Sequence, residues 1–240
     1  MNNFFKIYSA TPSKNETGYV SHQVEISSVQ ENYDYTLSNS YLKTYFEKKI
    51  DYEVIFPVFE LVRGAKLTDL MNFSGGGSYS CMIISLRLLV ILEKYKIDGY
   101  QTFKIKIKTK DGLKDFYFFF MSAPECESKY IDWDKTIFRI KPFVGTETLE
   151  DNLKFKNFEE YFELHKEIFR VIKNKREVAV SDLLLKRELI DKDMFKFNFI
   201  SSGFFISERL KLEIEKQGIT GISFRDADGL REPSYSPEMD

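Results

Sequence analysis

The chain has few of the residues on which metal centres, disulfide frameworks and cysteine or histidine catalysis depend. Its 240 residues include two histidines and two cysteines, Cys81 and Cys126. None of them has a second Cys or His at the spacing of a zinc site. Carboxylates on both sides of Cys126 oppose a thiolate. We therefore expect no metal, no cofactor, no catalytic cysteine, and two thiols rather than a disulfide.

Long apolar runs are also missing. No stretch approaches the roughly 18 apolar residues that a membrane helix needs, because the longest candidate, residues 81–92, is interrupted by Ser85 and Arg87. Residues 1–19 contain neither a basic segment nor an apolar run of signal-peptide length. The expectation is a cytoplasmic protein without a membrane partner.

An excess of charge of either sign is missing too. The 35 basic and 37 acidic side chains leave a formal net charge of −2, whereas nucleic-acid binders are usually clearly basic. We therefore expect no nucleic-acid partner. What the chain does have is aromatic residues, with 23 Phe and 14 Tyr, and an apolar share of 43%. A chain with so many apolar rings folds into a globular core rather than remaining disordered.

Periodic patterns predict both strands and helices. Residues 101–110 alternate between apolar side chains and lysines, Asp111-Gly112 is a turn signal, and residues 115–121 form the returning strand of a hairpin. Further strands are predicted at residues 24–29, 53–61, 137–143, 195–199 and 219–224. Helices are predicted at residues 38–50, 85–95, 158–172, 181–189 and 207–217. The fold class is therefore α+β, with mixed, mainly antiparallel aromatic-rich sheets packed with amphipathic helices.

Two segments of the chain match at an offset of 122 residues. The matching pairs are SLRL with SERL at 85–88 and 207–210, EK with EK at 93–94 and 215–216, and IDGY with ITGI at 97–100 and 219–222. In both segments a serine caps a helix and a glycine permits a tight passage into the next strand.

The internal match predicts two related βαβ-like halves. They span residues 1–145 and 146–240 and form one continuous globular domain. The acidic tail, from about residue 226, is expected to fray.

GFFISERL at 203–210 and GITGISF at 218–224 resemble the C-terminal ending of a family of bacterial immunity proteins encoded beside polymorphic toxins. IDWDKT at 131–136 resembles its IDW(E/D)KS element, with Thr136 in place of the usual serine. An aromatic strand precedes that element and Phe138 follows it, in the family's order. The resemblance covers about residues 84–224, and the first 75 residues carry no such motif.

The resemblance implies a cytoplasmic protein that binds a cognate toxin domain and neutralises it without catalysis, in competition between bacteria. No hydrolase, metalloprotease or nucleotide-binding motif opposes this interpretation. Two alternatives stay open. One is a hydrolase or transferase whose site is assembled in space. The other is a nucleic-acid-binding module that uses Lys104, Lys106, Lys108, Lys110 and Lys114.

A partner with a basic active site, such as a nuclease, would be attracted by acidic clusters. The candidate partner-binding residues are acidic side chains and the only tryptophan, a typical hot-spot residue: Glu125, Glu127, Asp132, Trp133, Asp134, Glu159, Glu160 and Glu163. The simpler interpretation is a solvated surface for each acidic cluster, and packing of its own loop for Trp133. The motif residues Ser85, Ser207, Arg209 and Gly221 are assigned to the scaffold.

Overall fold

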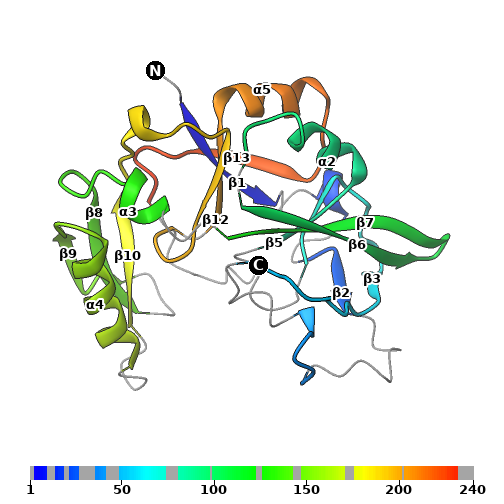
Figure 1. The fold of residues 1–240 in the computed structure, drawn as a ribbon, viewed down its shortest axis with the longest axis horizontal. Helices are drawn as coiled ribbons and strands as arrows, with labels where there is room; N and C mark the ends of the chain where they lie inside the picture. Colours follow the sequence, from blue (N-terminus) through cyan, green and yellow to red (C-terminus); the bar gives the residue numbers. More distant parts are fainter. Residues whose placement is uncertain are drawn as a thin grey trace.

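The α+β fold predicted from the sequence is confirmed, with three sheets packed against helices (Figure 1). The structure is a computed structural model. It describes residues 3–9, 14–18, 22–26, 36–41, 49–73, 81–97, 99–122, 126–142, 147–170, 176–201 and 203–231. Within these ranges two sheets are antiparallel and the third is mixed.

The mixed sheet has six strands in the order β2-β3-β6-β7-β5-β4. They are β2 (Val24–Ile26), β3 (Phe59–Leu61), β4 (Leu70–Met71), β5 (Cys81–Ile84), β6 (Tyr100–Thr109) and β7 (Gly112–Met121). A bridge between Val24 and Phe73 joins its two ends. The predicted hairpin is β6–β7, and its lysines face solvent while Ile105 and Ile107 are buried.

The second half of strand β7, residues 116–121, is buried on both faces, which explains its run of aromatic residues. Phe118 and Phe120 point into a core within the six-stranded sheet. Phe119 and Met121 point to the other side, where helix α2 (Leu86–Leu92) packs. A strand with two buried faces reads as a continuous apolar run rather than an alternating one.

The second sheet has the order β11-β12-β1-β13. It contains β1 (Phe4–Ser9), β11 (Met194–Phe197), β12 (Gly203–Ser207) and β13 (Ile222–Asp226), and helix α5 (Glu208–Lys216) packs on it. Strand β1 was not predicted. It lies between β12 and β13, so the first described strand completes a sheet made from the end of the chain.

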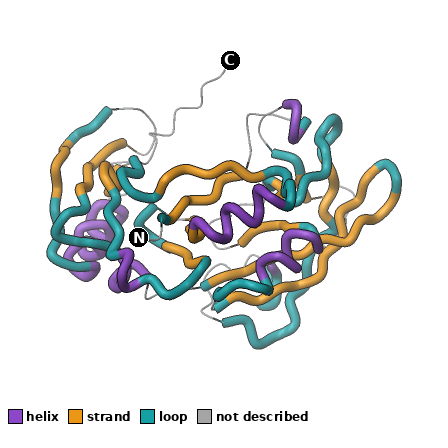
Figure 2. The backbone as a smooth tube through the Cα atoms, turned by 90° about the horizontal axis from the view of Figure 1, so that it is seen from above, coloured by secondary structure: helices purple, strands orange, loops and turns teal. Residues whose placement is uncertain are grey.

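The third sheet and two helices form what we call the α4 lobe. It comprises α3 (Cys126–Tyr130), β8 (Ile137–Pro142), β9 (Glu150–Leu153), α4 (Phe158–Arg170) and β10 (Arg176–Asp182). The lobe lies at one end of the molecule, and the β6–β7 hairpin extends at the other (Figures 1 and 2). In sequence the lobe stands between β7 and β11. Two short helices, α1 (Lys14–Thr17) and a 3-10 turn at Arg187–Leu189, lie outside these groups.

Two predicted helices need correction. Residues 36–40 form turns and a bridge from Ser40 to Ile55, so the predicted helix does not begin at residue 38, and residues 49–50 are not helical either. Residues 42–48 of this prediction lie outside the described ranges. The helix at residues 181–189 is also wrong. Its supposed cap, Ser181-Asp182, belongs to the end of β10, because pairing with β8 outweighs the local capping signal.

The two segments that match in sequence have the same structure. Each is a hairpin, β4–β5 or β11–β12, followed by a capping serine, a helix and a strand. Ser85 accepts a hydrogen bond from the N–H of Leu88, and Ser207 accepts one from Leu210. The serine caps are thus confirmed, whereas the division of the whole chain into halves stays a prediction.

Two buried aspartates join these segments to each other. Asp69 precedes the first hairpin and accepts a hydrogen bond from Ser85 Oγ at 2.6 Å in its own segment. Its other oxygen accepts from the N–H and Oγ1 of Thr220, in the second segment, at 2.9 and 3.0 Å. Both segments therefore donate hydrogen bonds to the carboxylate of Asp69.

Asp193 makes the reciprocal arrangement. It precedes the second hairpin and accepts from Ser207 Oγ at 2.7 Å and from Arg209. Its Oδ2 also accepts from the N–H of Lys96, which follows the helix of the first segment, at 2.9 Å. Burial opposes ionisation of Asp193, but these hydrogen bonds outweigh it and lower the pKa of the carboxyl.

The repeated segments require glycine at two positions, because another part of the backbone passes too close for a Cβ atom. Gly99 and Gly221 have φ of +69° and +80°, a left-handed conformation that side chains disfavour. A Cβ at Gly99 would lie 2.7 Å from the carbonyl oxygen of Ser122, and one at Gly221 would collide with that of Leu70. Gly221 is therefore part of the scaffold, as predicted.

The chain remains paired a little beyond β13. Leu230 bridges to Leu183, and Ala227 is buried. The rest of the predicted acidic tail, from residue 232 on, lies outside the described ranges.

Removing the cap at Ser207 tests this arrangement. Ser207→Ala should lower the free energy of unfolding by about 1–2 kcal/mol, because the α5 cap and one hydrogen bond to Asp193 are lost. Urea unfolding measures the change. Ser223→Ala, on the exposed face of β13, is the matched control and should stay within about 0.5 kcal/mol of the parent. Equal stabilities for both variants would contradict the capping role.

Candidate functional site

Three phenylalanine rings form a ridge where α4 of the α4 lobe meets the turn between β11 and β12, and we call it the aromatic ridge. Phe158 and Phe162 lie one turn apart on α4, with ring centroids 5.4 Å apart. Phe199, on the turn after β11, packs against Phe162 at 5.0 Å and against Phe158 at 5.9 Å. Phe199 is 45% exposed, whereas the other two rings are half-buried. The ridge therefore presents an apolar surface to solvent with Phe199 as its most prominent member.

The sequence of α4 separates apolar from acidic side chains. Asn157 begins the helix, because its Oδ1 accepts a hydrogen bond from the N–H of Glu160 at 3.0 Å. Apolar residues at spacings of three and four cover the lobe core. The remaining side of the helix carries four exposed glutamates, which we call the acidic face: Glu159, Glu160, Glu163 and Glu167.

The backbone of Phe199 is fixed from two helices. Glu127, on α3, accepts hydrogen bonds through Oε1 from the N–H groups of Asn198 and Phe199, the latter at 2.8 Å. The hydroxyl of Tyr161, on α4, donates to the carbonyl oxygen of Phe199 at 3.3 Å. Both backbone polar groups of the exposed residue are therefore paired.

Two buried lysines hold the same turn. Lys196 Nζ donates to Oδ1 of Asn198, and Lys6 Nζ donates to Oγ of Ser201 at 2.9 Å. Ser201 has a φ of 49°, a left-handed conformation that is uncommon outside glycine. We call Glu127, Lys6 and Lys196 the buried charged network.

Burial makes the ionised forms of this network unfavourable. Glu127 is 0% exposed, Lys196 1% and Lys6 6%. Burial raises the pKa of Glu127, although the N–H groups of Phe199 and Asn198 oppose it. Burial also lowers the pKa of Lys196 to about 8, against the attraction of Glu127. Three charged side chains are thus removed from water to fix one turn, which costs stability.

The predicted partner-binding residues divide into exposed and buried groups around α4. Asp134, Glu159, Glu160 and Glu163 are exposed. Asp132 is half-buried and forms an ion pair with Lys135 at 2.9 Å. The exposed members are therefore free to meet a partner from the surface of one lobe.

Glu127 and Trp133 lie below that surface. Trp133 stacks on Phe138 with ring centroids 5.9 Å apart and packs edge-on against Phe158 at 6.3 Å. It supports the first turn of α4, as its simpler interpretation expects. Glu127 holds the turn of Phe199 instead of facing solvent. Glu125 lies outside the described residues.

Phe199 and Lys196 are functional candidates that the sequence does not single out. The alternation of Phe195, Phe197 and Phe199 predicts one strand, but β11 ends at Phe197. The sequence patterns make no prediction for Lys196, and the structure buries all four residues of β11. The sequence SSG at 201–203 signals a turn after this strand. It does not reveal which of the three phenylalanine rings is exposed to solvent.

The pattern of the Immunity protein family (Imm11) matches residues 43–229. The chain belongs to this family. The match begins well before the first recognised motif and so extends the resemblance toward the N-terminus. A search of curated proteins finds no similar protein. Membership of Imm11 indicates a toxin-neutralising role with a toxin as partner, and immunity proteins of this kind are generally not enzymes.

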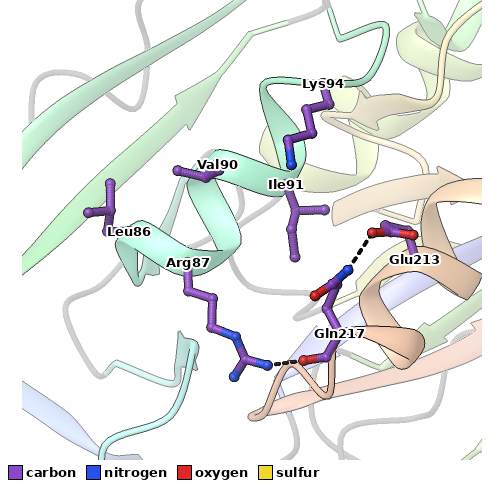
Figure 3. A pocket seen from close by; sticks show the side chains of 7 residues that line it. All are labelled: Leu86, Arg87, Val90, Ile91, Lys94, Glu213 and Gln217. Atoms are coloured by element: carbon purple, nitrogen blue, oxygen red, sulfur yellow. Dashed lines mark hydrogen bonds between the residues drawn. The ribbon is translucent and has the colours of Figure 1, made fainter.

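A shallow groove of about 520 Å³ separates α2 and α5 of this Imm11 chain (Figure 3). Its lining residues are Leu86, Arg87, Val90, Ile91, Lys94, Glu213 and Gln217. Arg87 spans the groove and donates to the backbone oxygen of Gln217, whose side chain donates to Glu213 at 2.8 Å. These side chains include no hydroxyl, thiol or imidazole, so the groove holds no pairing of a serine, threonine or cysteine nucleophile with a histidine base.

The charge of the exposed lysines on β6 of the Imm11 chain is partly neutralised by carboxylates. Lys104 and Lys106 both pair with Asp115, at 2.8 and 2.7 Å. Their hydrogen bonds lower the pKa of Asp115 to about 2. Lys108 lies 3.6 Å from a carboxylate oxygen of Glu60. These pairs reduce the positive field that a nucleic-acid partner would meet.

In the described ranges of the Imm11 chain, no three His, Cys, Asp or Glu side chains gather as a metal site would require. No helix in the same ranges is long and apolar enough to cross a bilayer.

The raised pKa of Glu127 predicts a pH-dependent stability. Its proton is held more tightly in the folded protein than in the unfolded chain, where glutamates titrate near about 4.3. Its contribution is therefore complete below that pH and is lost as the pH rises through the folded-state pKa. Glu127→Gln keeps an acceptor oxygen and cannot ionise. It should gain stability relative to the parent between about pH 4 and 7, as measured by urea unfolding.

The control for this experiment is Glu93→Gln, at the exposed C-terminal end of α2. It removes the same charge from the surface and corrects for the change in net charge. A Glu127→Gln difference that follows the control at every pH would contradict the burial effect.

Proposed function

We propose that this chain neutralises a cognate toxin of a bacterial polymorphic toxin system by direct, non-catalytic binding in the cytoplasm. The observation that carries the proposal is the family match over residues 43–229. The α4 lobe supports it, because an exposed aromatic ridge beside an acidic face has the composition of a protein-binding surface.

The proposed binding surface joins the aromatic ridge to the exposed predicted residues. Glu159, Glu160 and Glu163 lie on the acidic face, and Asp134 is exposed beside Trp133, which packs against the first turn of α4. Apolar rings would supply the affinity, and the carboxylates would steer association and select the partner. Binding there would cover the active site of the toxin or block access to it.

Direct neutralisation predicts a defined stoichiometry. Cells that express the toxin domain encoded beside this gene should grow only when this chain is co-expressed, and the two proteins should co-purify. Toxin activity titrated with the purified chain, at concentrations well above the Kd, should fall linearly to zero at one equivalent. A non-catalytic inhibitor inactivates only the toxin molecules that it binds. The molar ratio at which toxin activity reaches zero therefore distinguishes binding from catalysis.

Two outcomes would contradict this proposal. Complete inactivation by a small fraction of an equivalent would indicate that the chain modifies the toxin or destroys its product. An absence of both rescue and complex, with both proteins folded by circular dichroism, would refute the neutralising role. Chain unfolded by heat and added in the same titration is the control for non-specific effects.

A further inference from the structure

We infer that Phe199 is the anchor of the toxin interface, preorganised by the buried charged network, and that it enters an apolar recess on a cationic face of the toxin. This inference rests on the proposed function and specifies the partner surface. It follows from three observations on the α4 lobe: how the turn is held, how the ring is exposed and which charges surround it.

The first observation is that the turn is fixed at a cost to stability. Glu127, Lys196 and Lys6 come from three separate elements and converge on residues 198–201. One oxygen of Glu127, Oε2, is buried without a hydrogen bond among the described residues. Apolar side chains would fill such positions at lower cost. A costly network is expected where it fixes a conformation needed for binding, because a rigid anchor loses less entropy on association.

The second observation concerns the ring itself. Most exposed apolar side chains, such as Leu113 at the tip of the β6–β7 hairpin, need no explanation. Phe199 differs because its backbone N–H and C=O are both bonded and its ring is braced by Phe158, Phe162 and His165. A large ring held in one orientation at the surface has the properties of a hot-spot residue.

The third observation is the sign of the surrounding charge. One cation lies on the ridge itself, because Lys166 Nζ is 4.9 Å from the centroid of the Phe162 ring, but it pairs with Glu163. Glu160 accepts a hydrogen bond from the N–H of Lys156. Glu159 and Glu167 have no ion pair within the described part of the chain. Burial lowers the pKa of His165, so the braced imidazole adds no positive charge near neutral pH. The ridge is therefore flanked by negative charge, which complements a partner face rich in Lys and Arg.

The experiment measures the Kd and the association rate of the purified full chain with the toxin domain encoded beside its gene. Phe199→Ala should weaken binding at least about 30-fold, as expected for truncation of a buried aromatic anchor. Leu113→Ala removes an exposed side chain at the opposite end of the molecule and should change the Kd less than about twofold. Melting temperatures confirm that both variants are folded.

The role of the network is tested by two substitutions at Glu127. Glu127→Ala removes the acceptor of both N–H groups and should weaken binding about tenfold or more. Glu127→Gln keeps the acceptor and should restore the affinity to within about threefold of the parent. Each variant is compared with the parent at a temperature at which it is fully folded. If Glu127 only stabilised the fold, folded Glu127→Ala would bind as tightly as the parent, and Glu127→Gln would have no lost affinity to restore.

The charge of the partner is tested by salt and by charge reversal. Glu159→Lys combined with Glu163→Lys should slow association at least about tenfold at low salt and remove most of its salt dependence. An unchanged association rate would overturn the cationic partner face. Glu93→Lys combined with Glu215→Lys, at the exposed ends of α2 and α5, makes the same change in net charge and is the control.

The outcomes separate the inference from the function on which it rests. If the parent chain does not bind the toxin, the proposed function fails, and the inference with it. If the parent binds and Phe199→Ala binds equally well, the function stands and the anchor is overturned. If Phe199→Ala weakens binding but Glu127→Gln fails to restore what Glu127→Ala loses, the preorganising network is overturned.

Discussion

The two repeated segments of this protein are joined by a pair of buried aspartates, and the rest of the structure depends on them. Asp69 and Asp193 each accept hydrogen bonds from both segments. Within its own segment each carboxylate is paired by a serine and an arginine, and the other segment adds backbone N–H donors. An unpaired buried charge is costly, so losing these partners would destabilise the junction. The helices α2 and α5 are therefore held side by side, and the six-stranded and four-stranded sheets meet at a fixed junction (Figure 1).

Local patterns were enough to predict a large part of this fold. The β6–β7 hairpin, helix α4 and the serine caps of α2 and α5 each leave a signal within a few residues. Contacts between distant positions leave none. Asp69 lies 16 positions from Ser85 and 151 from Thr220, and β1 pairs with strands some 200 residues away. The false helix at residues 181–189 shows the converse, because a capping signal was overruled by pairing with a distant strand.

The candidate site shows the same limit more sharply. Composition and charge directed attention to the α4 lobe, where four of the eight predicted residues are exposed. They did not distinguish Glu127, which acts below the surface, from glutamates that face solvent. Alternation concealed the exposed Phe199, because it assumes that a strand continues, and no sequence signal marked Lys196 as buried. Which ring emerges is decided by hydrogen bonds from α3, α4 and β1.

The position of the α4 lobe in the chain has a consequence for how this family can diversify. The lobe is an insertion between the two segments that the aspartates unite, with its ends leading from β7 and into β11. Substitutions on its outer surface leave the aspartate pairs untouched. With the interface proposed above, a toxin that changes its surface imposes change on this insertion and on the β11–β12 turn that carries Phe199, while the aspartate pairs are retained. Residues of the recognition surface can then change while those that hold the frame stay the same, as in antibodies, which carry variable loops on a constant framework.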